Sequence, residues 1–273
     1  MKRIEQISAT HPATFSFMIT FLFISMLIIS AILGNLWPGD AIYGQPGSIL
    51  GRIISTIILL LLLSRLGWMQ PAGFTTPGRF GMWMISLLLL AYAAAASMYA
   101  LVGSLNLRFF DTALPALVTL FILVAAFMEE IVFRGLILQA LVHAWGSTRV
   151  GVTKSILVSA LFFCSVHLLD FLSGRLLYVV LLQSLEAFFL GILLGALVLI
   201  GRSIYPAVLL HSGLNLSAYL LIGGNGLEPA SSSWLLLGLL MIPPAALGIY
   251  LLHARYQPVT DKQMTNDLHR LPY

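Results

Sequence analysis

Charged residues are scarce in this sequence, and their scarcity excludes a water-soluble globule. Lys, Arg, Asp and Glu make up 9% of the 273 residues, while hydrophobic residues make up 59%. Soluble domains carry roughly 25% charged residues, because most of their surface must be hydrated. So few charges cannot cover a protein of this length, and most of its surface must therefore face lipid.

Cysteine is almost absent, and the positive charge is dispersed. The single Cys164 excludes an intramolecular disulfide framework and a zinc cluster made of cysteines. The net charge of +4 is spread along the chain and does not predict a nucleic-acid partner. The partners that remain are the lipid bilayer and hydrophobic molecules that enter it.

Long apolar runs fill the chain and predict transmembrane helices. A bilayer core of about 30 Å needs roughly 20 apolar residues per helix. Turn-forming triplets such as Trp37-Pro38-Gly39 and Thr76-Pro77-Gly78 separate the runs. The sequence predicts an all-α, polytopic helix bundle of about eight spans, at residues 14–34, 49–66, 81–103, 112–142, 155–173, 177–200, 205–222 and 233–252.

The basic residues predict the orientation of these spans. With both termini cytoplasmic, ten of the 14 Lys and Arg residues lie on the inner side. Arg52, Arg108 and Arg175 lie on the outer side, and Arg134 lies inside a span. The positive-inside rule therefore favours cytoplasmic termini. We expect a multi-pass protein of the cell membrane, which is the cytoplasmic membrane if the source is bacterial.

Polar side chains inside the apolar runs need an explanation. A charged group at the bilayer centre costs at least ~2.5–3.5 kcal/mol on insertion scales, so such groups are rare and usually functional. Glu186 in the sixth run is one case, for which a structural role beside Arg175 or Arg202 is the preferred reading. The others are Glu129, Glu130 and Arg134 in the fourth run, His167 in the fifth, and His211 and Asn215 in the seventh.

The spacing of these residues predicts one shared site. Glu130 and Arg134 are four residues apart with the acid first, the favourable order for an ion pair within a helix. Glu129 then points about 100° away, toward a different neighbour. His211 and Asn215 are one helical turn apart and share a face.

Three motifs in order give the chain a resemblance to a known family. They are Glu-Glu-x-x-x-Arg at 129–134, Phe-x-x-x-His at 163–167, and His-x-x-x-Asn at 211–215. In these residues the chain resembles the CPBP family of intramembrane proteases, which includes CAAX prenyl proteases and bacteriocin-processing, Abi-like proteins. The resemblance implies an eight-helix endopeptidase that cleaves hydrophobic, lipidated or leader-bearing peptides.

The resemblance also implies a division of the chain and a role for each site residue. Residues 112–222 would form the protease core, between motif-free helices at 1–111 and a last helix with a polar tail at 223–273. By the resemblance, Glu129 and His167 activate water, Glu130 and Arg134 support the geometry, and His211 and Asn215 stabilise the oxyanion.

Two mechanisms and two other functions stay open at this point. His167, His211 and Glu129 could form a zinc site with two histidines and one carboxylate. Alternatively, no cofactor is bound and a glutamate deprotonates water directly, which we favour because no His-Glu-x-x-His helix is present. The other functions are a non-catalytic bacteriocin-immunity or membrane scaffold protein, and a proton- or ion-coupled transporter.

Overall fold

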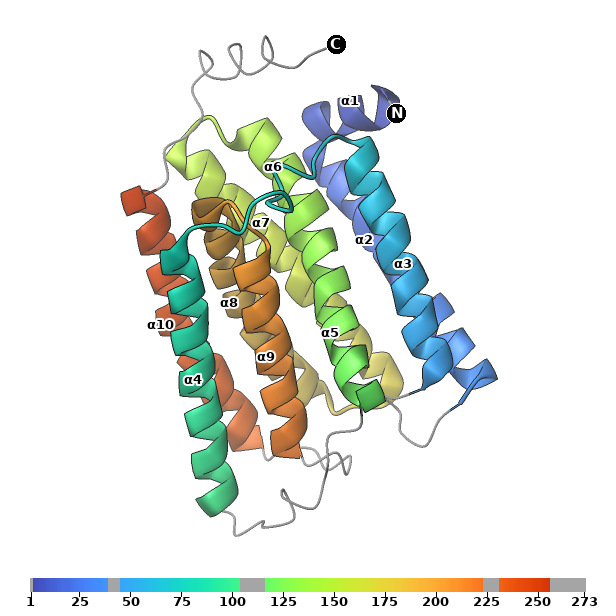
Figure 1. The fold of residues 1–273 in the computed structure, drawn as a ribbon, viewed down its shortest axis with the longest axis vertical. Helices are drawn as coiled ribbons and strands as arrows, with labels where there is room; N and C mark the ends of the chain where they lie inside the picture. Colours follow the sequence, from blue (N-terminus) through green and yellow to red (C-terminus); the bar gives the residue numbers. More distant parts are fainter. Residues whose placement is uncertain (1, 39–44, 104–115, 223–230, 256–273) are drawn as a thin grey trace.

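The computed structural model describes residues 2–38, 45–103, 116–222 and 231–255, and every regular element in these ranges is helical. The long helices run side by side along the height of the molecule (Figure 1). They are α2 (Pro12–Leu36), α3 (Pro46–Arg65), α4 (Phe80–Gly103), α5 (Ala116–Glu130), α7 (Arg149–His167), α8 (Leu177–Gly201), α9 (Tyr205–Ile222) and α10 (Ser231–Arg255).

Four short elements complete the bundle and extend two of these helices. They are α1 (Lys2–Thr10), the π-helix η3 (Ile131–Ile137), α6 (Leu138–Trp145) and the 3₁₀-helix η4 (Leu168–Ser173). The predicted run 112–142 is therefore a broken rod made of α5, η3 and α6. The run 155–173 covers α7 and η4, and each of the other six runs falls on one long helix.

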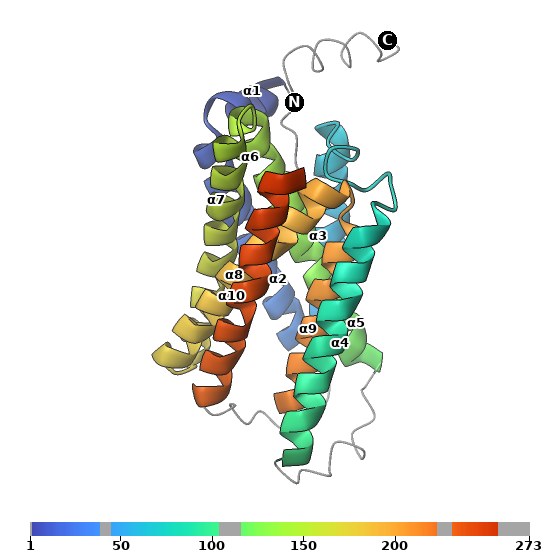
Figure 2. The ribbon, with the colours of Figure 1, turned by 90° about the vertical axis from the view of Figure 1, so that its left-hand side faces the viewer.

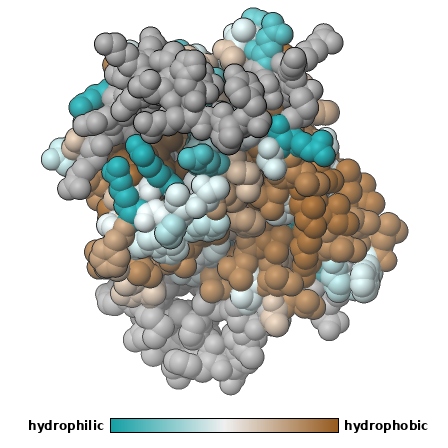
Figure 3. All heavy atoms as spheres, turned by 45° about the horizontal axis from the view of Figure 1, so that its top comes forward, coloured by the Kyte–Doolittle hydropathy of each residue, from teal (hydrophilic) through white to brown (hydrophobic). Residues whose placement is uncertain are grey.

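The surface and the helix lengths confirm a polytopic membrane protein. Apolar side chains cover the side of the bundle in Figure 3. Hydrophilic side chains gather near the end of the bundle that is at the top in Figure 1 and is tilted toward the viewer in Figure 3. Within the described residues, shorter apolar stretches lie at Phe80–Ala95 and Ile242–Ala254. Five segments are long and apolar enough to cross a membrane: Pro12–Leu36, Pro46–Arg65, Ala116–Trp145, Arg149–Ser173 and Leu177–Gly201.

The first and last described helices share one end of the bundle. The short helix α1 and the C-terminal end of α10 both lie at the top in Figures 1 and 2. Both ends of the described chain therefore lie on the same side, as an even number of spans requires. That this side is cytoplasmic stays a prediction from the basic residues.

The core is built where the broken rod meets its neighbours. Phe133 of η3 packs edge-to-face on Phe23 of α2, with ring centroids 5.5 Å apart, and Leu59 and Leu63 of α3 are buried in the same cluster. The α5 part of the rod packs against α3 and α9, whereas α6 packs mainly against α7. The rod therefore runs through the centre of the bundle and carries its polar residues there.

The π-helix is sealed from lipid and tied to α7. All seven of its residues are buried. The carbonyl oxygen of Phe133 accepts hydrogen bonds from the N–H of Leu138 and from the Ser159 hydroxyl of α7, the latter at 2.9 Å. Such π-turns frequently occur at functional sites. Here the π-turn follows Glu130 directly and contains Arg134.

Close contact between α2 and α3 gives a test of the packing. A Cβ atom on Gly51 would lie 2.8 Å from the Ser30 Cα, a backbone atom that cannot move alone. We expect Gly51→Ala to lower the melting temperature in detergent, because overpacking costs about 1–3 kcal/mol. Gly81→Ala is the control, since nothing lies within 4 Å of its added Cβ. Equal melting temperatures for the two variants would contradict the predicted close packing.

Candidate active site

The centre of the site is the buried carboxylate of Glu130. Its Oε1 atom accepts a hydrogen bond from Arg134 Nη1 at 2.9 Å and lies 2.8 Å from His211 Nδ1. The side chains of Glu130, Arg134 and His211 are 0%, 1% and 3% exposed. The predicted ion pair between Glu130 and Arg134 is confirmed, and α9 joins it through His211.

Glu129 lies on the other side of the same imidazole ring. Its Oε2 atom is 3.6 Å from His211 Nε2, and its side chain is 18% exposed. Because His211 Nδ1 is hydrogen-bonded to Glu130, the other ring nitrogen, Nε2, faces Glu129. Of the two adjacent glutamates, one is sealed and the other is accessible.

Phe163 packs against the cationic and imidazole groups of the site. The Arg134 guanidinium carbon lies 4.5 Å from the centre of the Phe163 ring. The rings of His167 and His211 meet the same ring nearly edge-on, at centroid distances of 5.2 and 5.6 Å. Phe163 thus restricts the orientation of three polar side chains from three helical elements, and it does so from an almost fully buried position.

A glycine brings the backbone of α8 into the site. Arg134 Nη2 donates to the carbonyl oxygen of Gly191 at 3.5 Å, a long hydrogen bond. A Cβ on Gly191 would lie 3.0 Å from the Ala160 Cβ and 3.3 Å from the Phe163 Cδ1. The absence of a side chain therefore lets α8 approach α7, and it leaves a backbone acceptor within reach of the guanidinium.

His167 and Asn215 lie beside this cluster without joining its hydrogen bonds. His167 ends α7, and the charges of Glu129 and His211 both act on its ring. Asn215 is half-buried on α9, one turn beyond His211. Within the described part of the chain, neither side chain has a hydrogen-bond partner. The structure thus links Arg134 to Glu130, Glu130 to His211 and His211 to Glu129, and it places His167 against Phe163 beside this chain of contacts.

The predicted zinc ligands do not form a closed group. Among the residues that the structure describes, no three His, Cys, Asp or Glu side chains are arranged to hold a metal ion. His211 and Glu129 face each other, but His167 is not placed as a third ligand beside them. The described residues therefore do not fit the three-ligand zinc site that the sequence left open.

Glu186 is separate from the hydrogen bonds of the site. It is half-buried on α8, and it makes no hydrogen bond or ion pair with the described residues. The predicted neighbour Arg175 instead bonds Asp170 at 3.2 Å and Gln183 at 2.8 Å.

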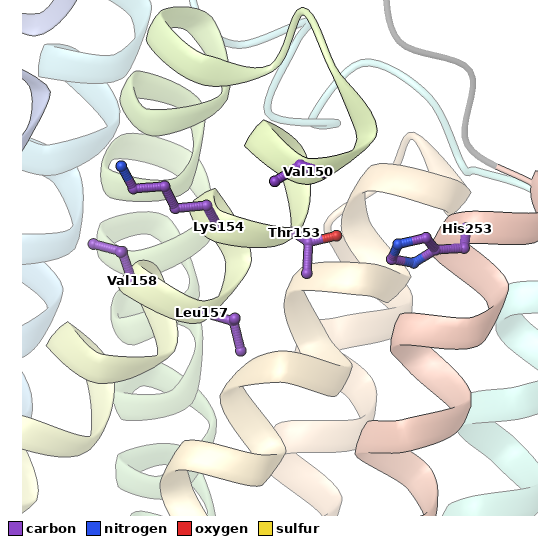
Figure 4. Close-up of a pocket in the computed structure, with 6 residues that line it drawn as sticks. All are labelled: Val150, Thr153, Lys154, Leu157, Val158 and His253. Carbon is purple, nitrogen blue, oxygen red and sulfur yellow. The ribbon is translucent and has the colours of Figure 1, made fainter.

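A groove of about 380 Å³ lies away from the site, between α7 and α10 (Figure 4). The groove shares no residue with the polar cluster and therefore does not form part of this site. Its lining consists of Val150, Thr153, Lys154, Leu157, Val158 and His253.

One half-buried arginine, Arg52, was not predicted as part of any site. Arg52 was assigned to the outer side as a topology signal, but its guanidinium packs on the Phe121 ring of α5, 4.4 Å from the centroid. The charge of Glu129 acts on it. The signal was present in the sequence, because Arg52 falls inside the apolar run 49–66.

Comparison with known families shows what the segment around this cluster is similar to. A family model described as Type II CAAX prenyl endopeptidase Rce1-like matches residues 111–217, the segment that holds all three motifs. Residues 111–217 are thus similar to this family. The resemblance predicted from the motifs is thereby confirmed, and the Rce1-like segment supports an intramembrane endopeptidase. No curated protein and no solved structure matches the chain.

The buried ion pair of the Rce1-like segment predicts a large loss of stability when one partner is removed. Arg134→Met leaves the Glu130 carboxylate buried with one partner fewer, which costs about 3–5 kcal/mol for buried pairs. We expect a lower melting temperature in detergent, and partial recovery in the double variant Arg134→Met/Glu130→Leu. The control is Arg79→Met, because Arg79 is exposed. An Arg134→Met protein that melts like the control would contradict this prediction.

Proposed function

We propose that this protein is an intramembrane endopeptidase in which Glu129 activates water for attack on a peptide bond. The observation that carries the proposal is the position of the His211 imidazole, which lies between the buried carboxylate of Glu130 and the partly exposed carboxylate of Glu129. Glu130, bonded to Arg134, fixes the ring from one side. Glu129 faces the other side, where it has no strong hydrogen bond to give up and can accept a proton.

Activation of water needs a base within hydrogen-bond reach of the attacking molecule. Glu129 is the accessible acid of the cluster, and the charge of Glu129 also acts on His167. We assign water to these two residues: Glu129 takes its proton while the oxygen attacks the scissile carbonyl carbon. His167 orients the water, because its ring is restrained against Phe163.

The tetrahedral intermediate carries a negative charge that the site must stabilise. Nδ1 of His211 is committed to Glu130, so Nε2 faces Glu129, and it shares the proton that Glu129 takes from water and thereby becomes a donor beside the oxyanion. Asn215, one turn further along α9, supplies an amide N–H on the same face. Two fixed donors of this kind form an oxyanion hole, and each is typically worth about 3–4 kcal/mol in the transition state.

Collapse of the intermediate completes the reaction. The carbon–nitrogen bond breaks, and Glu129 returns its proton to the leaving amine, which restores the carboxylate. Glu130 and Arg134 stay ionised and hydrogen-bonded throughout, so they act as positioning residues. The reaction therefore consumes one water and yields a new carboxyl end and a new amino end.

The substrate class follows from the family description and the depth of the site. The matched family is described by its action on CAAX prenyl proteins, whose lipidated cysteine lies three residues before the carboxyl end. A cluster inside the membrane is accessible to a lipid-anchored or hydrophobic peptide that enters from the bilayer. We therefore propose hydrophobic or lipidated peptides as substrates, with residues 112–222 as the protease core.

Substitution of the proposed base tests this function. Glu129→Gln should lower kcat about 10²–10⁴-fold, the usual contribution of a general base. The readout is release of the C-terminal tripeptide from a farnesylated peptide, followed by mass spectrometry of protein reconstituted in vesicles. The melting temperature should stay near that of the wild type, since Glu129 has no close hydrogen bond.

Glu186→Gln is the matched control for that experiment. It removes a second carboxylate from the spans, but one that lies outside the hydrogen-bonded cluster, and we expect full activity. Wild-type rates in Glu129→Gln would exclude the proposed base. Loss of folding in Glu129→Gln would instead favour the reading of the cluster as a structural network.

Metal removal tests the choice between the two mechanisms. His167, His211 and Glu129 do not form a three-ligand group, so we expect cleavage to survive a strong zinc chelator. Elemental analysis of the purified protein should give well below one zinc per chain. Stoichiometric zinc, with activity lost to the chelator and restored by added zinc, would overturn the metal-free mechanism.

A further inference from the structure

Arg52 is a cation inside the bundle that no described carboxylate neutralises directly. Its Nε atom is buried and has no hydrogen-bond partner among the described residues. The guanidinium lies over the Phe121 ring, 4.4 Å from its centroid, so it points across from α3 to α5. A guanidinium nitrogen that is kept from water and has no partner costs free energy, and a bound anion offsets that cost.

The other basic residues in the described spans and loops are accounted for. Arg134 is paired with Glu130, and Arg175 is paired with Asp170. The remaining described Lys and Arg side chains with an assigned exposure lie on the surface: Arg65, Arg79, Arg149, Lys154 and Arg202. Within that part of the chain, Arg52 is therefore the one Lys or Arg side chain with a buried, unpaired nitrogen atom, and it can bind an anionic ligand.

The separation along α5 between the ring beneath Arg52 and the proposed base is about the length of a tripeptide. Phe121, which carries the guanidinium on its face, precedes Glu129 by eight residues on α5, a rise of about 12 Å. Three residues in extended conformation span about 10 Å. The charge of Glu129 acts on Arg52, although no direct ion pair joins them among the described residues.

We propose that Arg52 binds the free C-terminal carboxylate of the substrate and so sets the distance from the chain end to the scissile bond. The proposal rests on the proposed function, because it takes the scissile bond to lie at Glu129. A guanidinium binds a carboxylate through two parallel hydrogen bonds, a geometry that also gives orientation. A carboxylate entering the apolar bundle needs such a counter-charge, and Arg134 is already occupied.

Position supports a peptide carboxylate rather than a lipid headgroup as the ligand. A basic side chain that binds headgroups extends toward the membrane surface. The Arg52 guanidinium instead packs against an aromatic ring of the neighbouring helix, with Nε sealed from solvent. It faces α5, the helix that carries the proposed base.

The test compares two farnesylated peptides that differ in the carboxyl end, one a free acid and the other an amide. We expect the wild type to cleave the acid with a kcat/KM about 10- to 100-fold higher, the usual range for a hydrogen bond to a charged group. Arg52→Gln should lose this preference by slowing cleavage of the acid alone. Arg52→Lys should retain part of it, and Arg65→Gln, an exposed arginine on the same helix, should retain all of it.

Three outcomes would overturn the role of Arg52. They are equal rates of the wild type on acid and amide, equal losses on both peptides in Arg52→Gln, and a full preference in Arg52→Gln. Equal losses would mean that Arg52 acts on Glu129 or on the fold. If Arg52→Gln does not fold, the comparison is made with Arg52→Lys, whose acid preference must be weaker than that of the wild type.

A binding experiment separates this inference from the proposed function. In the Glu129→Gln background, the acid peptide should bind more tightly than the amide, measured by fluorescence anisotropy, and Arg52→Gln should remove the difference. Acid-selective binding without cleavage by the wild type would reject the protease and keep Arg52 as a carboxylate site. Cleavage without acid selectivity would reject Arg52 and keep the protease.

Discussion

The structure depends on the neutralisation of one carboxylate that has no contact with water. Glu130 is fully buried, and its Oε1 atom is shared by the guanidinium of Arg134 and the imidazole of His211. Lipid supplies no hydrogen bonds, so separating these three groups would leave each of them buried without a partner. The free-energy cost of that state keeps them together. The bond between Glu130 and His211 fixes the register of α9 against the broken rod.

The same constraint extends to the two helices that surround the pair. Arg134 reaches the backbone of α8 at Gly191, and its other face lies on the Phe163 ring of α7. The broken rod, α7, α8 and α9 therefore meet at this one ion pair. The adjacent Glu129, turned by about 100°, is left out of this arrangement and keeps partial access to solvent. Two neighbouring residues of the same type thereby acquire different environments, one for structure and one for chemistry.

The parts of the fold that follow from local pattern were predictable. Apolar runs of membrane-spanning length located the eight long helical segments, and the four-residue spacing of Glu130 and Arg134 predicted their ion pair. The contact of Glu130 with His211 was not predictable, because it joins residues 81 positions apart. Motif order placed both in one site, but it could not say which carboxylate meets which nitrogen.

Two side-chain positions could not be predicted from the sequence. Arg52 was assigned to the membrane surface because it lies near the start of its run, whereas its long side chain turns inward to Phe121. The zinc site was one of two mechanisms that the sequence left open, and whether His167 can join His211 and Glu129 depends on how the end of α7 directs its ring, which packs against Phe163. Both depend on side-chain direction, which residue type and spacing alone do not determine.

The π-turn at Ile131–Ile137 has a geometric consequence for the whole rod. A π-turn holds one residue more than an α-helical turn. The residues after it are therefore rotated by about 100° about the helix axis relative to an unbroken α-helix. Ala116–Glu130 can then direct its buried stripe at α3 and α9, while Leu138–Trp145 directs its own at α7. The π-turn thus sets the angle between the buried faces of the two halves of the rod. Deletion of one residue there would rotate one half away from the helices that it packs against.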